Sequence, residues 1–286
     1  MKIKQIPEDF IVKENLKIKI EPGKYFYYKL TKKNWNTLDI IKEISYRLKT
    51  KDIGYAGIKD RNALTTQYIS TTKKIDFKIK DIEFEYFGTG KERIYLGFLE
   101  SNEFVITIRD LDKQLKAPKE MINYFGEQRF SEKNPLIGKL LIKKQFKEAC
   151  SELNLNIENN DAIKSLRSLG LKELKFYIHA YQSELWNQLA EKSKKKIIPI
   201  IGFLTEGKDY DIILKKEGIT TKDFIIRSIP EISSEGSERP RVMEIKNFKS
   251  LEFTDDELNP GKKKQIVSFK IPKGSYATIV IKNLKN

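Results

Sequence analysis

Strand-like segments stand at both ends of this chain, and a long helical segment lies between them. Residues 10–30 predict two strands around the turn Glu21-Pro22-Gly23, because aromatic and β-branched residues favour strands and Pro-Gly favours turns. Residues 265–283 predict strand again, with a break at 272–274. Strands at both ends around a middle of different composition indicate a domain that is interrupted by an insertion.

Shorter patterns predict the remaining elements. The segments EFEYFG, RIYLGFL and EFVITIR alternate apolar and polar residues between positions 81 and 109, which predicts strands. A helix is expected after the capping residues Asn36 and Thr37, because apolar residues follow at helical spacing. These apolar residues are Leu38, Ile41, Ile44 and Leu48. Further helices are expected at 119–125, 143–153 and, most clearly, 174–190.

The charge of the chain indicates a polyanionic partner. Its 286 residues include 55 Lys and Arg against 40 Asp and Glu, a net charge of +15. The excess is uneven, because residues 1–50 hold 12 basic and 6 acidic side chains whereas residues 201–250 hold 9 of each. A basic surface around the N-terminal part of the chain favours nucleic acid as the partner.

Several chemistries lack their residues. One histidine, His179, and one cysteine, Cys150, are too few for a typical structural zinc site or for an internal disulfide. No phosphate-binding glycine motif occurs, and His179 with Ser183 has no evident orienting acid. We therefore expect neither a metal nor a cofactor. No apolar run reaches the about 20 residues of a membrane helix, and MKIKQIPEDF lacks the apolar core of a signal peptide. A cytoplasmic protein without a membrane segment is expected.

The stretch GYAGIKDRNALTTQ, residues 54–67, concentrates polar and small residues around Asp60. In one interpretation Asp60 is a turn residue in a solvated charge cluster. In the other it is a nucleophile that Lys59 and Arg61 keep ionised, while Gly57 lets a bulky substrate approach and Gln67 holds the loop or the substrate. The spacing of the residues leaves both interpretations open.

The same stretch closely resembles the signature G-x-K-D-x-x-A-x-T-x-Q of the TruD family of pseudouridine synthases. Further segments resemble motifs of this family in the same order. They are Lys4 with residues 7–10 (P-E-D-F), residues 32–37, Asn102 with Phe104, residues 123–130 (N-Y-F-G-E-Q-R-F), residues 179–183 with Asn187, and residues 272–278 (P-K-G-S-Y-A-T). The departures are Ser101, Ser131, Lys282-Asn283 and a middle region that is short for the family.

The resemblance implies an α+β fold: a mixed, largely antiparallel pseudouridine synthase sheet with a compact inserted α/β domain. The expected boundaries are 1–148 and 241–286 for the catalytic domain and 149–240 for the insertion. Asp60 would be the catalytic carboxylate. The residues expected to bind substrate are Lys4, Phe10, Asn123, Phe125 and Tyr276, and those expected to support the loop are Gly57, Lys59 and Gln67. The aromatic residues among them are equally typical of a protein core.

The implied activity is the conversion of a uridine to pseudouridine without a cofactor or metal. The implied substrate is tRNA, at uridine 13 in many family members, with other RNAs in some, and we expect a monomer. A non-catalytic RNA-binding protein derived from such an enzyme is the alternative, since it would share the basic surface. A protein-binding scaffold is a third interpretation, although it would not need that surface.

Overall fold

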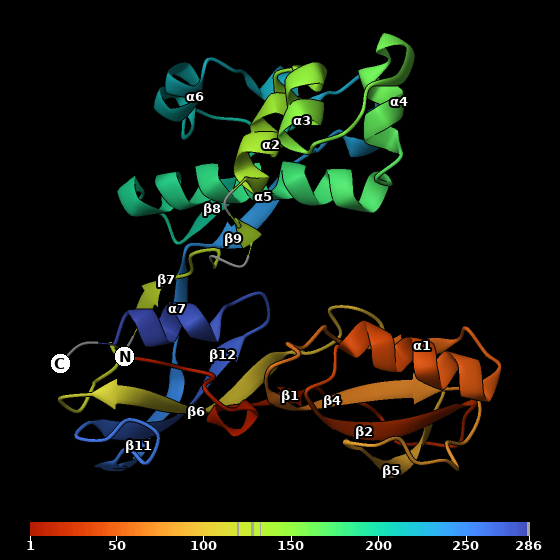
Figure 1. Cartoon of the computed structure of the whole chain (residues 1–286), viewed down its shortest axis with the longest axis vertical. Coiled ribbons are helices and arrows are strands. Elements are labelled where there is room, and N and C mark those ends of the chain that lie inside the picture. The colour runs from red at the N-terminus through yellow and green to blue at the C-terminus, as the bar shows by residue number, and fades with distance from the viewer. Residues whose placement is uncertain (119, 127–128, 132, 285–286) are drawn as a thin grey trace. The chain divides into compact units, whose positions relative to one another are not determined.

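The computed structural model describes residues 1–118, 120–126, 129–131 and 133–284 (Figure 1). The chain divides into two compact units: residues 1–120 with 244–286, and residues 121–243. The first boundary between the units, at 120/121, therefore lies before the expected boundary at 148/149, and the second, at 243/244, lies after the one expected at 240/241. The first lies earlier because helix α2 (Asn134–Ile142) packs on helix α5 (Leu171–Lys192) of the second unit.

The first unit is built on an eight-stranded sheet with the order β11-β12-β6-β1-β4-β2-β5 and with β3 on β4. Its strands are β1 (Phe10–Asn15), β2 (Tyr25–Lys33), β3 (Ile53–Tyr55), β4 (Leu64–Thr71), β5 (Ile82–Gly90), β6 (Ser101–Leu111), β11 (Lys246–Asp255) and β12 (Lys263–Pro272). Strands β1 and β4 are parallel, and their other described pairings in this sheet are antiparallel. The predicted α+β class with a mixed, largely antiparallel sheet is confirmed.

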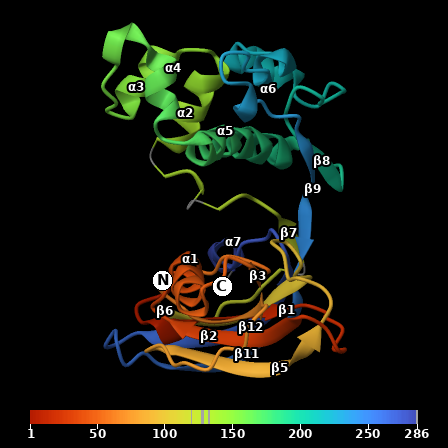
Figure 2. The same ribbon diagram turned by 90° about the vertical axis from the view of Figure 1, so that its right-hand side faces the viewer.

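Helix α1 (Thr37–Leu48) covers one face of the sheet over β4 and β2 (Figures 1 and 2). The side chain of Asn36 caps it by accepting a hydrogen bond from the backbone N–H of Leu38 at 3.1 Å, as its capping pattern predicted. Its buried face is slightly rotated from the predicted one. Ile40 is buried together with Ile44 and Leu48, whereas Leu38 and Ile41 are half-buried.

Three segments differ from the sequence-based predictions. Residues 93–99 form a loop rather than a strand, because Ile94 donates its N–H to the Ser70 side chain and Gly97 donates to the Ala56 carbonyl instead of to a neighbouring strand. Within the expected helix 119–125, residues Glu120–Ile122 form strand β7, and Lys119 lies outside the described residues. Helix α7 (Ala277–Lys282) replaces the end of the last predicted strand, after a turn in which Gly274 has φ 77°.

The second unit is mainly helical, and α5 runs through it. This helix confirms the prediction for residues 174–190. The other helices are α2, α3 (Phe146–Glu152), α4 (Ala162–Arg167) and α6 (Asp211–Glu217). Two short ladders pair β8 (Ile197–Ile200) with β9 (Ser237–Pro240) and β7 with β10 (Val242–Glu244). Short 3-10 helices cover Pro7–Asp9 in the first unit and Glu158–Asn160, Thr221–Phe224 and Pro230–Ile232 in the second.

Candidate active site

Asp60 lies on the loop that joins β3 to β4 in the first unit. Its side chain is 42% exposed, and one carboxylate oxygen, Oδ2, forms an ion pair with the Lys4 ammonium. Asn62 donates a hydrogen bond to the Lys4 carbonyl at 3.1 Å, so the loop holds Lys4 at two points. The backbone of Lys4 has φ 59°, a left-handed conformation that is uncommon for a side chain of this kind. The structure thus places an accessible carboxylate directly against a positioned cation.

Lys32 holds the same loop from the protein interior. Its side chain is fully buried, and its ammonium donates hydrogen bonds to the carbonyls of Trp35 at 2.6 Å and Asp60 at 2.8 Å. Burial lowers the pKa of Lys32 to about 8, and the charge of Lys59 adds to this while Asp60 opposes it. The sequence reasoning did not single out Lys32, although it opens the segment 32–37 that resembles a family motif.

Lys59 does not face the Asp60 carboxylate, contrary to the prediction that it helps keep Asp60 ionised. Its buried ammonium is paired with Glu14 of β1, which also accepts the N–H of Tyr68 at 3.0 Å. A Cβ at Gly57 would lie 2.7 Å from the Lys59 ammonium and 2.9 Å from Glu14, so a glycine leaves room for this pair. Lys59 and Gly57 therefore support the loop from within.

Arg61, the other cation beside Asp60 in the sequence, donates from its Nε to the Asn34 carbonyl at 3.3 Å. Lys4, rather than either flanking residue, supplies the cation that is paired with Asp60. The difference arises because neighbouring residues on an irregular loop point in different directions.

Gln67 belongs to a buried hydrogen-bond chain under the loop. The Thr37 hydroxyl accepts the N–H of Lys59 at 3.0 Å and donates to Gln67 Oε1 at 2.9 Å. The first turn of α1 is thereby connected to the loop. Gln67 Nε2 and the Thr65 hydroxyl are buried without a hydrogen-bond partner among the described residues.

Phe10 is only 4% exposed and lies under Lys4. The Lys4 ammonium sits 4.1 Å from the centre of the Phe10 ring, and Phe104 packs edge-on at 5.9 Å. A cation over an aromatic face is attracted by the ring quadrupole. In this arrangement Phe10 supports Lys4, and its buried ring offers little exposed surface on which a base could stack.

Tyr276 is half-buried and stands at the N-terminal cap of α7. The turn that precedes it is connected to the start of the Asp60 loop through Gly97. The Lys273 ammonium donates to the Gly97 carbonyl at 2.8 Å, and the Gly97 N–H donates to the Ala56 carbonyl at 2.8 Å. Tyr276, Asp60 and Lys4 all belong to the first unit, and the contacts through Gly97 join the turn before Tyr276 to the Asp60 loop.

Asn123 and Phe125 belong to the second unit, where both are buried. Arg239 donates from Nη2 to the side-chain oxygen of Asn123 at 2.9 Å and to its carbonyl at 2.8 Å. The guanidinium of Arg239 also lies 4.1 Å from the centre of the Phe125 ring, which packs edge-on against Trp186. Asn187 binds both backbone groups of Phe125, at 2.9 Å and 3.2 Å.

The sequence reasoning did not assign a role to Arg239, because Asn123 and Phe125 lie more than 100 positions away from it in the sequence. Glu127 and Gln128, which belong to the motif-like segment 123–130, lie outside the described residues. The Ser183 hydroxyl donates to the His179 carbonyl at 2.7 Å, a local helix contact rather than an activated nucleophile.

The helices in the described part of the chain include none that is long and apolar enough to cross a membrane. The described His, Cys, Asp and Glu side chains form no group of three or more that could hold a metal ion.

Comparisons with known proteins agree with this fold. The family model "tRNA pseudouridine synthase D (TruD)" matches residues 1–158 and 202–284. A probable tRNA pseudouridine synthase D 2 of Methanocaldococcus jannaschii is 30% identical over 99% of this chain and 91% of that protein. The tRNA pseudouridine synthase D of Aquifex aeolicus is 28% identical over 99% of this chain and 98% of that protein. The crystal structure of a putative TruD from Methanosarcina mazei superposes with a TM-score of 0.76 and 25% identity, over 98% of this chain and 92% of that one.

These matches define an isomerase of the pseudouridine synthase class. Within that class, the chain belongs to the TruD family. The alignments with the M. jannaschii and A. aeolicus proteins extend over 386 and 384 positions, so these relatives contain residues that have no counterpart among the 286 of this chain.

Proposed function

We propose that this protein converts uridine 13 of tRNA to pseudouridine, with Asp60 as the nucleophile. The observation that carries the proposal is the exposed Asp60 carboxylate, which is paired with Lys4 on a loop that is held from within by Lys32 and Lys59. The names of the relatives support tRNA as the substrate.

In the proposed reaction, a carboxylate oxygen of Asp60 forms a bond to C1′ of the ribose while the bond from C1′ to N1 of uracil breaks. The departing uracil keeps the electron pair and turns. Its C5 then bonds to C1′ and displaces the carboxylate, C5 loses its proton, and N1 gains one. Since Lys4 contacts Oδ2, we assign the attack to Oδ1. The Lys4 ammonium orients the carboxylate and offsets its negative charge beside the phosphates of the substrate.

The substrate-binding part of the proposal assigns Tyr276 to stacking on the uracil, because its ring is half-buried beside the turn that is connected to the Asp60 loop. Phe10 acts through Lys4. Asn123 and Phe125, which contact Arg239, are the residues of the second unit that we assign to substrate binding. Gly57, Lys59 and Gln67 support the Asp60 loop.

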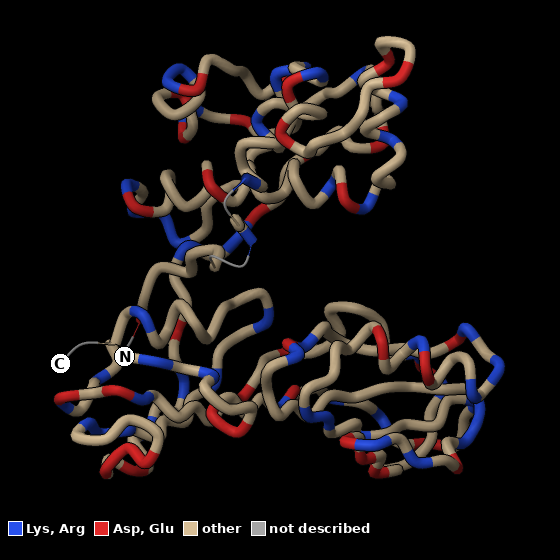
Figure 3. Tube along the Cα trace, in the orientation of Figure 1, with Lys and Arg blue, Asp and Glu red and all other residues tan. Residues whose placement is uncertain are grey.

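Charge supports RNA as the partner. Residues 121–243 hold 21 basic and 17 acidic side chains, a net charge of +4, whereas the rest of the chain holds 34 and 23, a net charge of +11. Lys and Arg residues occur along the described chain of both units (Figure 3). The unit that carries Asp60 is thus the more basic one, as expected for a unit that binds the phosphate backbone. We further propose that the protein acts in the cytoplasm as a monomer.

The alternative, an RNA-binding protein without catalysis, predicts the same charge but no chemistry. Release of tritium from tRNA that carries 5-tritiated uridine separates the two, since formation of the bond at C5 expels that hydrogen. We expect release with the unaltered protein. Asp60→Asn should abolish it while tRNA affinity stays within about threefold, because the amide keeps the shape but is not a nucleophile. Asp39→Asn, at an exposed aspartate of α1, is the control. Measurable turnover by Asp60→Asn would disprove the assignment.

A further inference from the structure

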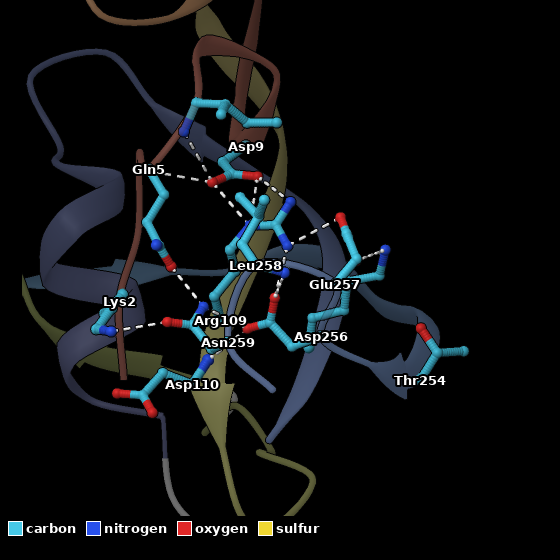
Figure 4. A network of polar contacts seen from close by, with 12 residues as sticks. Lys2, Gln5, Asp9, Arg109, Asp110, Thr254, Asp256, Glu257, Leu258 and Asn259 are labelled. Carbon is cyan, nitrogen blue, oxygen red and sulfur yellow. Dashed lines mark hydrogen bonds and ion pairs between the residues drawn. The ribbon is translucent and has the colours of Figure 1, made fainter. Parts of the chain in front are cut away.

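A buried charge network in the first unit centres on Arg109 of β6 (Figure 4). Arg109 is 3% exposed, and its guanidinium contacts both carboxylate oxygens of Asp9, with Nε at 2.9 and 3.0 Å. Its Nη1 contacts Asp256 at 2.8 Å. Asp9 and Asp256 are also buried, at 1% and 4% exposed. The network joins the start of the chain to the β11–β12 hairpin.

The Asp9 carboxylate also binds the backbone directly after Lys4. Its Oδ2 accepts the N–H of Gln5 at 3.0 Å and that of Ile6 at 3.2 Å (Figure 4). On the other side of Lys4, Lys2 and Arg109 exchange two backbone hydrogen bonds, each of 2.8 Å. The backbone is therefore held two residues before Lys4 and directly after it.

Asn259 strengthens the same arrangement through side chains. It accepts a hydrogen bond from the Lys2 ammonium at 2.7 Å and donates to the side-chain oxygen of Gln5 at 2.8 Å (Figure 4). It also donates to Asp256 at 2.8 Å. Among the described contacts, Asp256 reaches the segment around Lys4 indirectly, through Asn259, Arg109 and Asp110, whereas Asp9 binds that segment directly.

The left-handed backbone of Lys4 needs such contacts, because a residue other than glycine keeps this conformation only where its surroundings impose it. With this backbone, Lys4 reaches the Asp60 carboxylate. We propose that Asp9, oriented by Arg109, is a positioning residue that places Lys4 against Asp60. The inference rests on the proposed function of Asp60, and it gives a role to the aspartate of the P-E-D-F segment.

The test compares Asp9→Asn with Asp256→Asn. Both substitutions remove one carboxylate charge from the buried Arg109, so both should lower the melting temperature. Only Asp9→Asn disturbs the acceptor of the Gln5 and Ile6 amides. We expect it to lower kcat about 10- to 100-fold with little change in KM, because misplacing a reacting group by about 1 Å costs on this order. Asp256→Asn should lower kcat less than about threefold, a loss comparable to that of one peripheral contact.

A double-mutant cycle with Lys4→Met identifies the route of the effect. If Asp9 acts through Lys4, Asp9→Asn should have no further effect on the single-turnover rate in the Lys4→Met protein. An equal loss of rate in both backgrounds, or an equal loss in Asp9→Asn and Asp256→Asn, would overturn the proposal. Asn259→Ala keeps the Arg109 ion pairs with Asp9, Asp256 and Glu257, and it should show a smaller loss in the same direction, which maintains the test if Asp9→Asn does not fold.

Amide hydrogen exchange tests the positioning role of Asp9 independently of catalytic turnover. The Gln5 and Ile6 amides should be protected in the unaltered protein and in Asp256→Asn, and should exchange faster in Asp9→Asn. This outcome does not depend on turnover, so an inactive protein would refute the proposed function alone. Equal exchange rates at the Gln5 and Ile6 amides in both variants would refute the positioning role. This test remains available if Lys4→Met turns over too slowly for the double-mutant cycle.

Discussion

Replacing Lys59 with Met tests the finding that this lysine is structural. The Lys59 and Glu14 side chains are 8% and 0% exposed, so the pair is screened from water. Met has a similar length but no charge, and it would leave Glu14 with the Tyr68 N–H at 3.0 Å but without its cation. Breaking one side of a buried pair costs about 3–5 kcal/mol, and we expect a loss of stability of this size near pH 8.

The loss should depend on pH. Burial raises the pKa of Glu14 above its ordinary value of 4.5, and Lys59 opposes that rise. Without Lys59 the pKa of the folded state rises further, so the folded protein binds more protons than the unfolded one above pH 4.5. A raised pKa of this kind contributes stability that is complete below the unfolded value and is lost as the pH rises through the folded value. Lys59→Met should therefore be destabilised more at pH 8 than at pH 5.

Urea unfolding at both pH values measures this difference. The matched control is Lys59→Met combined with Glu14→Gln, which removes the unpaired charge and should recover much of the stability at pH 8. A loss below about 1 kcal/mol at pH 8 would be that of an exposed pair and would refute the reasoning. So would an equal loss at both pH values. The slope of log Kd for tRNA against log salt should stay unchanged, whereas a decrease of about one would mean that Lys59 contacts a phosphate.

Tyr276, Lys32 and the net charge of the chain each give one further prediction. Tyr276→Phe should keep most activity, whereas Tyr276→Ala should lose about 5- to 150-fold in activity, since a stacked base is worth about 1–3 kcal/mol. If Tyr276→Ala were fully active, or were inactive only because its melting temperature is lowered, the stacking role would be contradicted. Because burial lowers the pKa of Lys32 to about 8, against 10.5 for the exposed group, its folded state holds fewer protons between these values. Stability should therefore rise with pH in this window, and thermal melting of Lys32→Met should lack that contribution. The affinity for tRNA should fall steeply as salt is raised, because neutralised phosphates release counterions, and a flat dependence in a filter-binding titration would show that charge is not the main contribution.

Local chemistry in the sequence determined several elements of this fold. The start of α1 follows from Asn36, whose side chain accepts an N–H only two residues later, and the length of α5 follows from continuous helical spacing. Strands β1 and β2 were predicted on each side of the Pro-Gly turn, although each pairs with β4 rather than with the other. The local residues around Asp60 left a turn residue and a nucleophile open, and the resemblance of residues 54–67 to a family signature favours the nucleophile. Capping and periodicity act over a few residues, so the sequence alone is sufficient for them.

Only the tertiary structure decided the direction and the partner of each charged side chain. Lys59 is adjacent to Asp60 in the sequence, yet its ammonium pairs with Glu14, 45 positions away. Arg109 joins Asp9 and Asp256, which are 100 and 147 positions from it. A lysine or arginine has the same sequence pattern whether it faces RNA or a buried carboxylate. The choice depends on which distant strands the sheet brings side by side, and therefore on contacts that no local pattern records.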